Sequence, residues 1–174
     1  MAITYQLISS FTVATPAHSV TMSSIPATYT DLLVVASMRT DYSESSEGKF
    51  LLNNITTGTY NGRLLVGDGS VANSYPAPGA AAATWGLVLN GSGTTTNTFS
   101  NVEIYMPNYS STTLEKCFSI TGVTENNATS ALTWMVGSRN TTTGATNSIT
   151  FQAWQSFINF VAGTTFYIYG IKNS

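Results

Sequence analysis

The sequence predicts an all-β fold, an antiparallel β-sandwich or jelly roll of roughly ten strands. Short segments of alternating or β-branched apolar residues recur between turn signals along the chain. No segment has the spacing of a convincing amphipathic helix. The strongest strand signal is the unbroken apolar run Leu32–Ala36, which Met38 closes and which Asp31 and Arg39 bound on either side. A run this short cannot span a membrane and is typical of a central strand covered on both faces.

The length of 174 residues fits one domain spanning residues 1–174. Hydrophobic residues make up 43% of the chain, which is enough for a sizeable core. Charged residues make up only 8%, against roughly 25% in an average soluble domain, and threonine, serine and asparagine take their place. A surface of hydroxyls and amides suits close contact with neighbouring molecules. The net charge of −2 comes without a basic patch, so no nucleic-acid partner is expected.

The first part of the chain is expected to contain several strands separated by turns. Residues Thr15–Ala17 break the first strand, and Pro26 fixes a turn before the central run. Asn61 and Gly62 form the strongest short hairpin signal in the sequence. These breaks predict strands at Ile3–Val13, His18–Ser24, Thr28–Thr40, Phe50–Ile55 and Arg63–Val66.

A long loop is expected at about residues 67–84, because this segment has no usable periodicity. A short helix at Gly79–Ala83 is an alternative for its last part. Ordered loops longer than about 12–15 residues are uncommon in compact domains and are usually functional or mobile. The segment is therefore the first candidate contact region, with Tyr75, Pro76 and Pro78 as its least flexible residues.

The second half of the chain again alternates strands and turns. The turn Pro107–Ser111 predicts that the strands on either side of it form an antiparallel hairpin. The chain ends in a strand with aromatic residues on both faces, which ties that end into a sheet. The expected strands are Trp85–Leu89, Phe99–Met106, Leu114–Val123, Ala131–Val136, Ser148–Trp154 and Thr164–Lys172.

The sequence does not predict an enzyme. His18 is the only histidine, and there is no Gly-x-Ser-x-Gly elbow, so a surface or strand-edge histidine is favoured over a catalytic one. Cys117 is the only cysteine, which excludes an intramolecular disulfide, and a small buried core thiol is expected. Glu103 and Glu115 are the carboxylates that could face each other across the predicted hairpin, as a glycosidase requires. Solvated edge charges at Glu115 and Lys116 are the competing interpretation.

No metal or other cofactor is expected. The acids Asp41, Glu44 and Glu47 recur at every third position in a polar loop, which does not match the alternating oxygen ligands of a calcium loop. A solvated polar loop is the favoured interpretation of this cluster.

The aromatic residues divide into two groups. The three tryptophans lie in predicted strands among apolar neighbours, which favours core packing over a sugar-stacking platform; they are Trp85, Trp134 and Trp154. Tyrosines in loops or at strand ends are better candidates for an exposed contact surface; they are Tyr42, Tyr60, Tyr75 and Tyr109. Tyr42 and Tyr109 therefore join the loop residues as candidate contacts.

The first residues, Met1–Tyr5, contain neither a positive region nor an apolar stretch, so no secretory signal is expected. No segment approaches transmembrane length, and no membrane partner is expected.

Three segments resemble structural proteins of tailed bacteriophages. They are Ser24–Leu33, Phe99–Tyr109 and the Tyr-Gly-Ile-Lys ending Tyr169–Lys172. The resemblance implies a jelly-roll protein of the virion surface, often a homotrimer, made in the host cytoplasm without a signal peptide. β-rich modules of this kind serve as capsid decoration (cement) proteins, head fibres or tail-fibre tips.

Two functional hypotheses follow. The first is a non-enzymatic capsid cement or decoration protein that contacts the major capsid protein and stabilises the head, where several weak contacts made at once give high avidity. The second is a receptor- or carbohydrate-binding module of a head or tail fibre that uses the loop tyrosines. The missing shaft segment favours the first, because a strand is expected from about the third residue.

Overall fold

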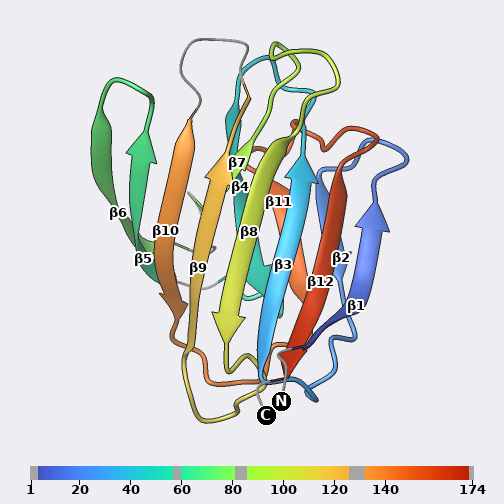
Figure 1. Cartoon of the computed structure of the whole chain (residues 1–174), viewed down its shortest axis with the longest axis vertical. Helices are drawn as coiled ribbons and strands as arrows, with labels where there is room; N and C mark the ends of the chain where they lie inside the picture. The colour runs from blue at the N-terminus through green and yellow to red at the C-terminus, as the bar shows by residue number, and fades with distance from the viewer. Residues whose placement is uncertain (1–3, 57–59, 81–85, 126–131, 173–174) are drawn as a thin grey trace.

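The structure is a computed structural model that describes residues 4–56, 60–80, 86–125 and 132–172, with the backbone alone at 77–80. Within these ranges the chain forms twelve strands and no helix. Figure 1 shows the strands in two layers, with the larger sheet in front of the smaller one. The predicted all-β fold of two packed antiparallel sheets is confirmed.

The larger sheet contains eight strands in the order β1-β12-β3-β8-β9-β10-β5-β6, and the smaller contains four in the order β2-β11-β4-β7. All pairings within both sheets are antiparallel. We call them the large sheet and the small sheet. The strands are β1 (Thr4–Thr12), β2 (Ser19–Met22), β3 (Asp31–Met38), β4 (Ser46–Leu52), β5 (Tyr60–Gly67), β6 (Ala72–Ala80), β7 (Leu87–Leu89), β8 (Ser100–Pro107), β9 (Lys116–Val123), β10 (Thr133–Asn140), β11 (Ile149–Ala153) and β12 (Thr165–Lys172).

Strand β3 lies inside the large sheet between β12 and β8, as the apolar run predicts. Alternate residues, Leu32 and Val34 among them, are buried toward the small sheet. The prediction that both faces of this strand are covered is wrong, because no second layer lies over the other face in the described chain. Leu33 and Val35 are nevertheless half-buried there. Their register partners on the flanking strands have long side chains: Tyr169 and Tyr105 beside Leu33, and Tyr167 and Glu103 beside Val35. Such neighbours allow an uninterrupted apolar run in a sheet with one open face.

The core fills the space between the two sheets. Phe151 of the small sheet stacks on Phe166 of the large sheet, with ring centroids 4.4 Å apart. Phe50 meets Phe118 edge-on at 5.3 Å, again across the two sheets. Each fully buried aromatic side chain of this kind stabilises the fold by about 1.5–3 kcal/mol. These pairs set how the small sheet sits over the large one.

The predicted loop at residues 67–84 is wrong for its central part, which forms strand β6 at the edge of the large sheet. Proline suits such an edge because it has no N–H, and its nitrogen can point away from the neighbouring strand. Pro76 pairs with Arg63 of β5 at this edge. The helix alternative is also wrong for Gly79 and Ala80, which belong to β6, and its remaining residues lie outside the described ranges.

The predicted hairpin turn at Asn61 and Gly62 is also wrong, because both residues lie within β5. A Cβ atom on Gly62 would lie 2.6 Å from the carbonyl oxygen of Gly137 on β10, so close strand approach explains this glycine. The actual β5–β6 turn is at Asp68–Ser70. The Asp68 carboxylate accepts hydrogen bonds from the backbone of Ser70 and Val71, and these bonds lower its pKa.

The segments Ser24–Leu33, Phe99–Tyr109 and Tyr169–Lys172 meet at one end of the sandwich. The ring of Tyr29 lies against Gly170, where an added Cβ would come within 2.3 Å of the ring. The hydroxyl of Tyr109 donates a hydrogen bond to the carbonyl oxygen of Pro26 and accepts one from the Tyr29 amide. Asp31 accepts a hydrogen bond from the amide of Asn108. These residues hold the ends of β3, β8 and β12 together.

This packing predicts opposite outcomes for two glycine substitutions in the large sheet. Gly170→Ala should destabilise the protein by about 1–3 kcal/mol, because Tyr29 must move to admit the methyl group. Gly137→Ala has open space around its Cβ and should be neutral or slightly stabilising. Urea denaturation of both variants measures the difference. Equal stability of the two variants would contradict the packing described.

Candidate binding surfaces

The outer face of the large sheet carries a row of apolar side chains. Strand register places Leu7 beside Tyr169, Tyr169 beside Leu33, and Leu33 beside Tyr105. The row therefore crosses four neighbouring strands, β1, β12, β3 and β8. We call these four residues the apolar stripe. Leu7 and Tyr105 are its exposed ends, and Tyr169 and Leu33 are half-buried between them.

Few charges lie near the apolar stripe. The nearest carboxylate in the register, Asp31, is buried and accepts a hydrogen bond from the hydroxyl of Tyr105 at 2.8 Å. This bond to a carboxylate raises the pKa of the Tyr105 hydroxyl. Glu103 is the exposed acid of the next row, between Val35 and Thr121. The stripe is therefore a mostly neutral, aromatic surface with fixed geometry.

The two edges of the large sheet differ in how they could pair with another chain. Strand β1 is nine residues long, contains no charged residue and no proline, and exposes Tyr5, Leu7 and Phe11. Strand β6 at the opposite edge contains Pro76 and Pro78, which remove two donors from its backbone. Natural proteins block free edges with prolines and charges. The β6 edge has such protection, and the β1 edge has only the bulge at Leu7–Ser9.

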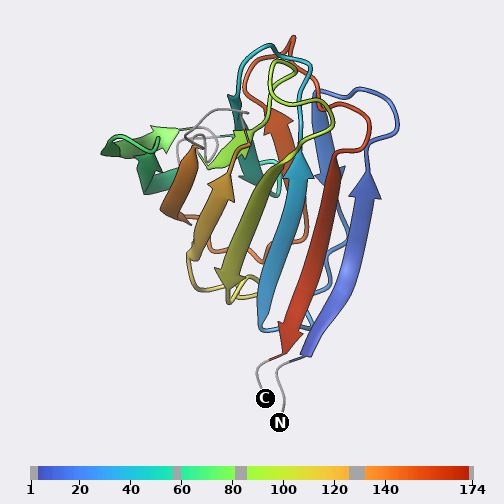
Figure 2. The same cartoon turned by 45° about the horizontal axis from the view of Figure 1, so that its top comes forward.

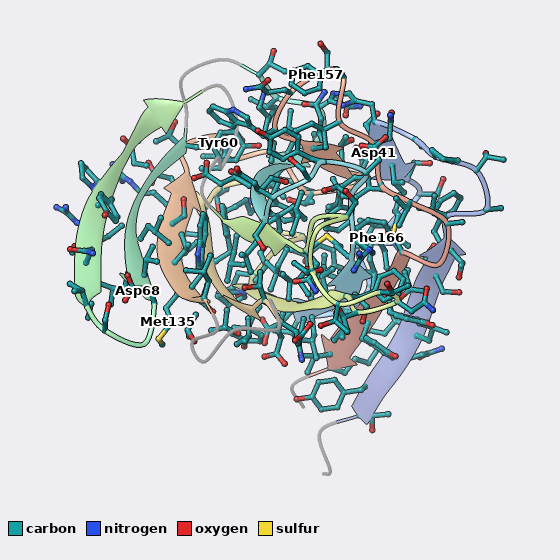
Figure 3. The ribbon with its side chains drawn as sticks, turned by 90° about the horizontal axis from the view of Figure 1, so that it is seen from above. Asp41, Tyr60, Asp68, Met135, Phe157 and Phe166 are labelled. Carbon is teal, nitrogen blue, oxygen red and sulfur yellow. The ribbon has the colours of Figure 1, made fainter. Side chains whose placement is uncertain are left out.

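The other half of the outer face contains shallow hollows. Two of them, of about 290 and 340 Å³, meet at Leu65 and Met135 on neighbouring strands β5 and β10. Figure 3 shows Met135 on the side of the molecule opposite to Phe157.

A further hollow of about 360 Å³ lies at the loop end of the sandwich. Figure 2 shows the loops that follow β3, β7 and β11 gathered at this end. We call the site the aromatic hollow. Its lining combines two exposed aromatic rings with polar side chains and includes Tyr42, Ser46, Glu47, Trp154, Gln155 and Ile158.

Buried Arg39 holds one of these loops. It follows β3, and its guanidinium donates to oxygens of the β7–β8 loop at 2.8–3.3 Å. The acceptors are the carbonyl oxygens of Ser92, Thr94, Thr95 and Thr98 and the hydroxyl of Thr94. The planar fork of arginine provides several donors at fixed angles, which lysine cannot reproduce.

The β7–β8 loop in turn supports the loop that carries Tyr42. The amide of Ser92 donates to the Tyr42 carbonyl at 2.6 Å, and that of Gly93 donates to Ser43 at 3.0 Å. A Cβ atom on Gly91 would lie 2.0 Å from the carbonyl oxygen of Glu44, so only glycine fits there. The contact fixes the position of Tyr42.

Asp41 fixes the β11–β12 loop, the third loop at this end of the sandwich. Its carboxylate accepts hydrogen bonds from the amide and the side chain of Asn159, both at 2.8 Å. Asn159 belongs to the β11–β12 loop, which also carries Trp154 and Phe157. Tyr42 and Phe157 face each other with ring centroids 6.3 Å apart. The predicted solvated loop fits Asp41 and Glu44, which are exposed, although Asp41 also binds Asn159; the prediction is wrong for Glu47, which lies half-buried in β4.

Glu47 is the half-buried acid of the aromatic hollow, and loss of solvent raises the pKa of its carboxyl above its usual 4.5. Its backbone carbonyl accepts a hydrogen bond from the amide of Trp154 at 3.1 Å. The positive charge of Lys49 lies over the same ring, with Nζ 5.5 Å from the ring centroid. Glu47 is therefore the acid of the hollow, and Lys49 lies next to the hollow at Trp154.

The predicted contact residues do not form one surface. Tyr42 lies at the aromatic hollow, whereas Tyr75 and Pro76 lie exposed on β6 at the edge of the large sheet. Pro78 belongs to β6, and its side chain is outside the described part of the structure. Tyr109 is fully buried, so its prediction as an exposed contact is wrong. Its hydroxyl bonds, which a strand-end position does not reveal, keep it inside.

Some of the other predictions of side-chain burial are confirmed and others are wrong. Tyr60 is buried, contrary to expectation, and its hydroxyl oxygen accepts a hydrogen bond from the Leu52 amide at 2.7 Å. Trp134 is buried, as predicted, whereas Trp154 is exposed and Trp85 lies outside the described residues. The core prediction for Cys117 is wrong: it faces outward, because Lys116, Phe118 and Ile120 occupy the inner positions of β9.

The candidate catalytic residues are used in structural contacts. His18 Nδ1 donates to the carbonyl oxygen of Ile158 at 2.9 Å, and Nε2 lies 3.0 Å from Gln152 Nε2. Glu103 pairs with Thr121 across the β8–β9 ladder and does not face Glu115. Glu115 instead forms an exposed ion pair with Arg139 at 2.8 Å.

Lys116 is buried, so its prediction as a solvated edge charge is wrong. Its Nζ donates to the carbonyl oxygens of Ser111, Leu114 and Thr143 at 2.6–3.1 Å, and burial lowers the pKa of the amine. Lys116 therefore ties together the loops at the opposite end of the sandwich from Arg39.

Within the described ranges, no three His, Cys, Asp or Glu side chains gather closely enough to hold a metal ion. The same residues include no helix long and apolar enough to cross a bilayer.

Comparison with known proteins returns no matching family model, no matching curated protein and no matching solved structure. Function must therefore be argued from the surfaces described above.

The Arg39 network predicts a large effect for a charge-conserving substitution. Arg39→Lys should lower the free energy of unfolding by at least about 2 kcal/mol, because buried carbonyl groups lose their donors. Hydrogen exchange should speed up at Ser92 and Gly93, whose amides hold the Tyr42 loop. Arg139→Lys, at the exposed ion pair, is the matched control and should change stability by no more than about 0.5 kcal/mol. Similar stability of both variants would refute the anchoring role.

The raised pKa of Glu47 predicts that the stability of the protein depends on pH. Because the folded-state pKa is raised, ionising Glu47 costs more in the folded chain than in the unfolded chain. Its contribution to stability is therefore present below about pH 4.5 and is lost as pH rises through the folded-state pKa. Glu47→Gln should raise the melting temperature at pH 7, and the gain should shrink toward pH 4. Melting curves at several pH values test this, and a gain that is independent of pH would contradict it.

Proposed function

We propose that this chain is a non-enzymatic virion structural protein, a capsid decoration (cement) protein that assembles as a homotrimer and stabilises the head. The apolar stripe is the surface that contacts the major capsid protein. The resemblance of three segments to phage structural proteins supports the virion assignment. The observation that carries the contact is the register, which lines up apolar residues from four neighbouring strands on a face with no second layer in the described chain.

The chemistry of the stripe supports a protein partner. Tyrosine and leucine side chains bury a large area at low entropic cost, and tyrosine hydroxyls remain able to form hydrogen bonds at an interface. Tyr105 is already held by Asp31, so little ordering is needed when the surface is covered. Repeated on a symmetric assembly, even weak contacts of this kind give strong overall binding.

The strand order supports the jelly-roll part of the proposal. The small-sheet order β2-β11-β4-β7 and the large-sheet neighbours β3-β8 and β5-β6 fit an eight-stranded jelly roll into which the β9–β10 hairpin is inserted. Strands β1 and β12 then extend the large sheet beyond β3. Both added strands carry residues of the apolar stripe, so the extension would widen the contact surface.

A charge in the apolar stripe should weaken capsid binding. Leu7→Lys places an ammonium group in the proposed interface and should weaken co-sedimentation with capsids at least about tenfold. Leu65→Lys is the matched control, since Leu7 and Leu65 are both 50% exposed on the same sheet face, and it should bind normally. Both substitutions are at exposed positions and should change stability by no more than about 0.5 kcal/mol.

Light scattering on the same proteins distinguishes contacts between copies in the trimer from contacts with the capsid. Wild type, Leu7→Lys and Leu65→Lys are all expected to be trimers across a dilution series. If Leu7→Lys instead dissociates the trimer, the stripe is a contact between copies and its assignment to the capsid is wrong. If the wild type neither forms a trimer nor sediments with capsids, the decoration function is wrong.

A further inference from the structure

The aromatic hollow has features that the proposed capsid contact does not use. It lies at the loop end, and Figure 3 shows Phe157, whose ring faces Tyr42, on the side of the molecule opposite to Met135. Three aromatic residues are exposed there: Tyr42, Trp154 and Phe157. An exposed aromatic cluster in loops is costly in water unless it has a ligand.

Polar groups accompany these rings within the same hollow. Glu47 offers a carboxylate, and Gln155 offers an amide with both donors and an acceptor. The hydroxyl of Tyr42 can both donate and accept a hydrogen bond.

The hollow is also preorganised. Tyr42 is held by the β7–β8 loop, which Arg39 anchors. Trp154 is held by the hydrogen bond that its amide donates to the Glu47 carbonyl. Asp41 fixes the loop that carries Phe157. Rigid placement reduces the entropy lost on binding, which is the main cost for a small ligand.

The ligand chemistry follows from these groups. Aromatic faces favour a flat apolar surface, and the surrounding acid, amide and hydroxyl groups favour a ligand with several hydroxyls at its edge. The lining contains one acid, Glu47, whose carboxylate can accept hydrogen bonds from a neutral ligand, and it includes no cationic side chain that would favour an anionic one. A pyranose ring has both an apolar C–H face and an edge of hydroxyls. A nucleobase also stacks, but the phosphates of a nucleic acid would meet a chain with net charge −2.

We propose that the aromatic hollow binds a neutral saccharide, which stacks on Trp154 and Tyr42 and forms hydrogen bonds with Glu47 and Gln155. This site is separate from the apolar stripe, and the proposal holds whether or not the chain decorates a capsid. On a virion, such a site would attach particles to glycans.

The test is a binding titration with defined probes. The panel consists of neutral trisaccharides of glucose, mannose, galactose and N-acetylglucosamine, together with a dinucleotide, measured by calorimetry and tryptophan fluorescence. At least one trisaccharide should bind with a Kd of about 1 mM or tighter. Tyr42→Ala and Trp154→Ala should each weaken that binding about tenfold.

Tyr75→Ala is the matched control, since Tyr75 is 40% and Tyr42 is 36% exposed and Tyr75 lies on β6. It should bind the trisaccharide as the wild type does, and circular dichroism should show all three variants folded. In case either hollow variant fails to fold, changes in the amide spectrum of the wild type on adding trisaccharide should centre on Gln155 and Trp154. Absence of trisaccharide binding, binding that survives both hollow substitutions, or binding of the dinucleotide alone would each overturn the proposal.

Discussion

The loop end of this sandwich depends on one buried guanidinium. Arg39 leaves strand β3 and donates to several oxygens of the β7–β8 loop, so the charge is neutralised by backbone dipoles rather than by a carboxylate in those contacts. A buried charge is tolerated only when its donors are satisfied. The Arg39 hydrogen bonds therefore fix the β7–β8 loop, and that loop positions the loop that carries Tyr42. Together these contacts shape the aromatic hollow.

The two sheets have different tasks. Their inner faces build the core through pairs such as Phe151 with Phe166, and this packing accounts for the fold without help from the surfaces. The outer face of the large sheet has apolar residues that the described core does not need. The two proposed binding regions, a sheet face and a loop cluster, can therefore change without disturbing the core. Such separation is common where a rigid scaffold carries variable contacts.

Local patterns predicted the strands well and side-chain environments less well. The apolar run at Leu32–Ala36 and the alternation in β8 depend on neighbouring residues alone, so their strands could be read from the sequence. The burial of Tyr109 depends on Pro26, which is distant in sequence, and the exposure of Cys117 depends on which phase of an alternating strand faces the core. The three segments on which the phage resemblance is based meet around Tyr29 and Gly170. Their structural role is to hold strand ends together. The aromatic hollow forms where three loops that are distant in sequence come together. A pattern of neighbouring residues cannot predict contacts between such loops.

The pairing of β1 with β12 has a mechanical consequence. Thr4 is paired with Lys172, so the two ends of the described chain lie at the same end of one antiparallel ladder. A force pulling these two residues apart would load the ladder one bond pair at a time, beginning with theirs, and would peel β1 from the sheet as a zipper opens. The sandwich should therefore yield easily to tension along that direction. Compression onto a neighbouring surface would meet the full stiffness of the packed layers.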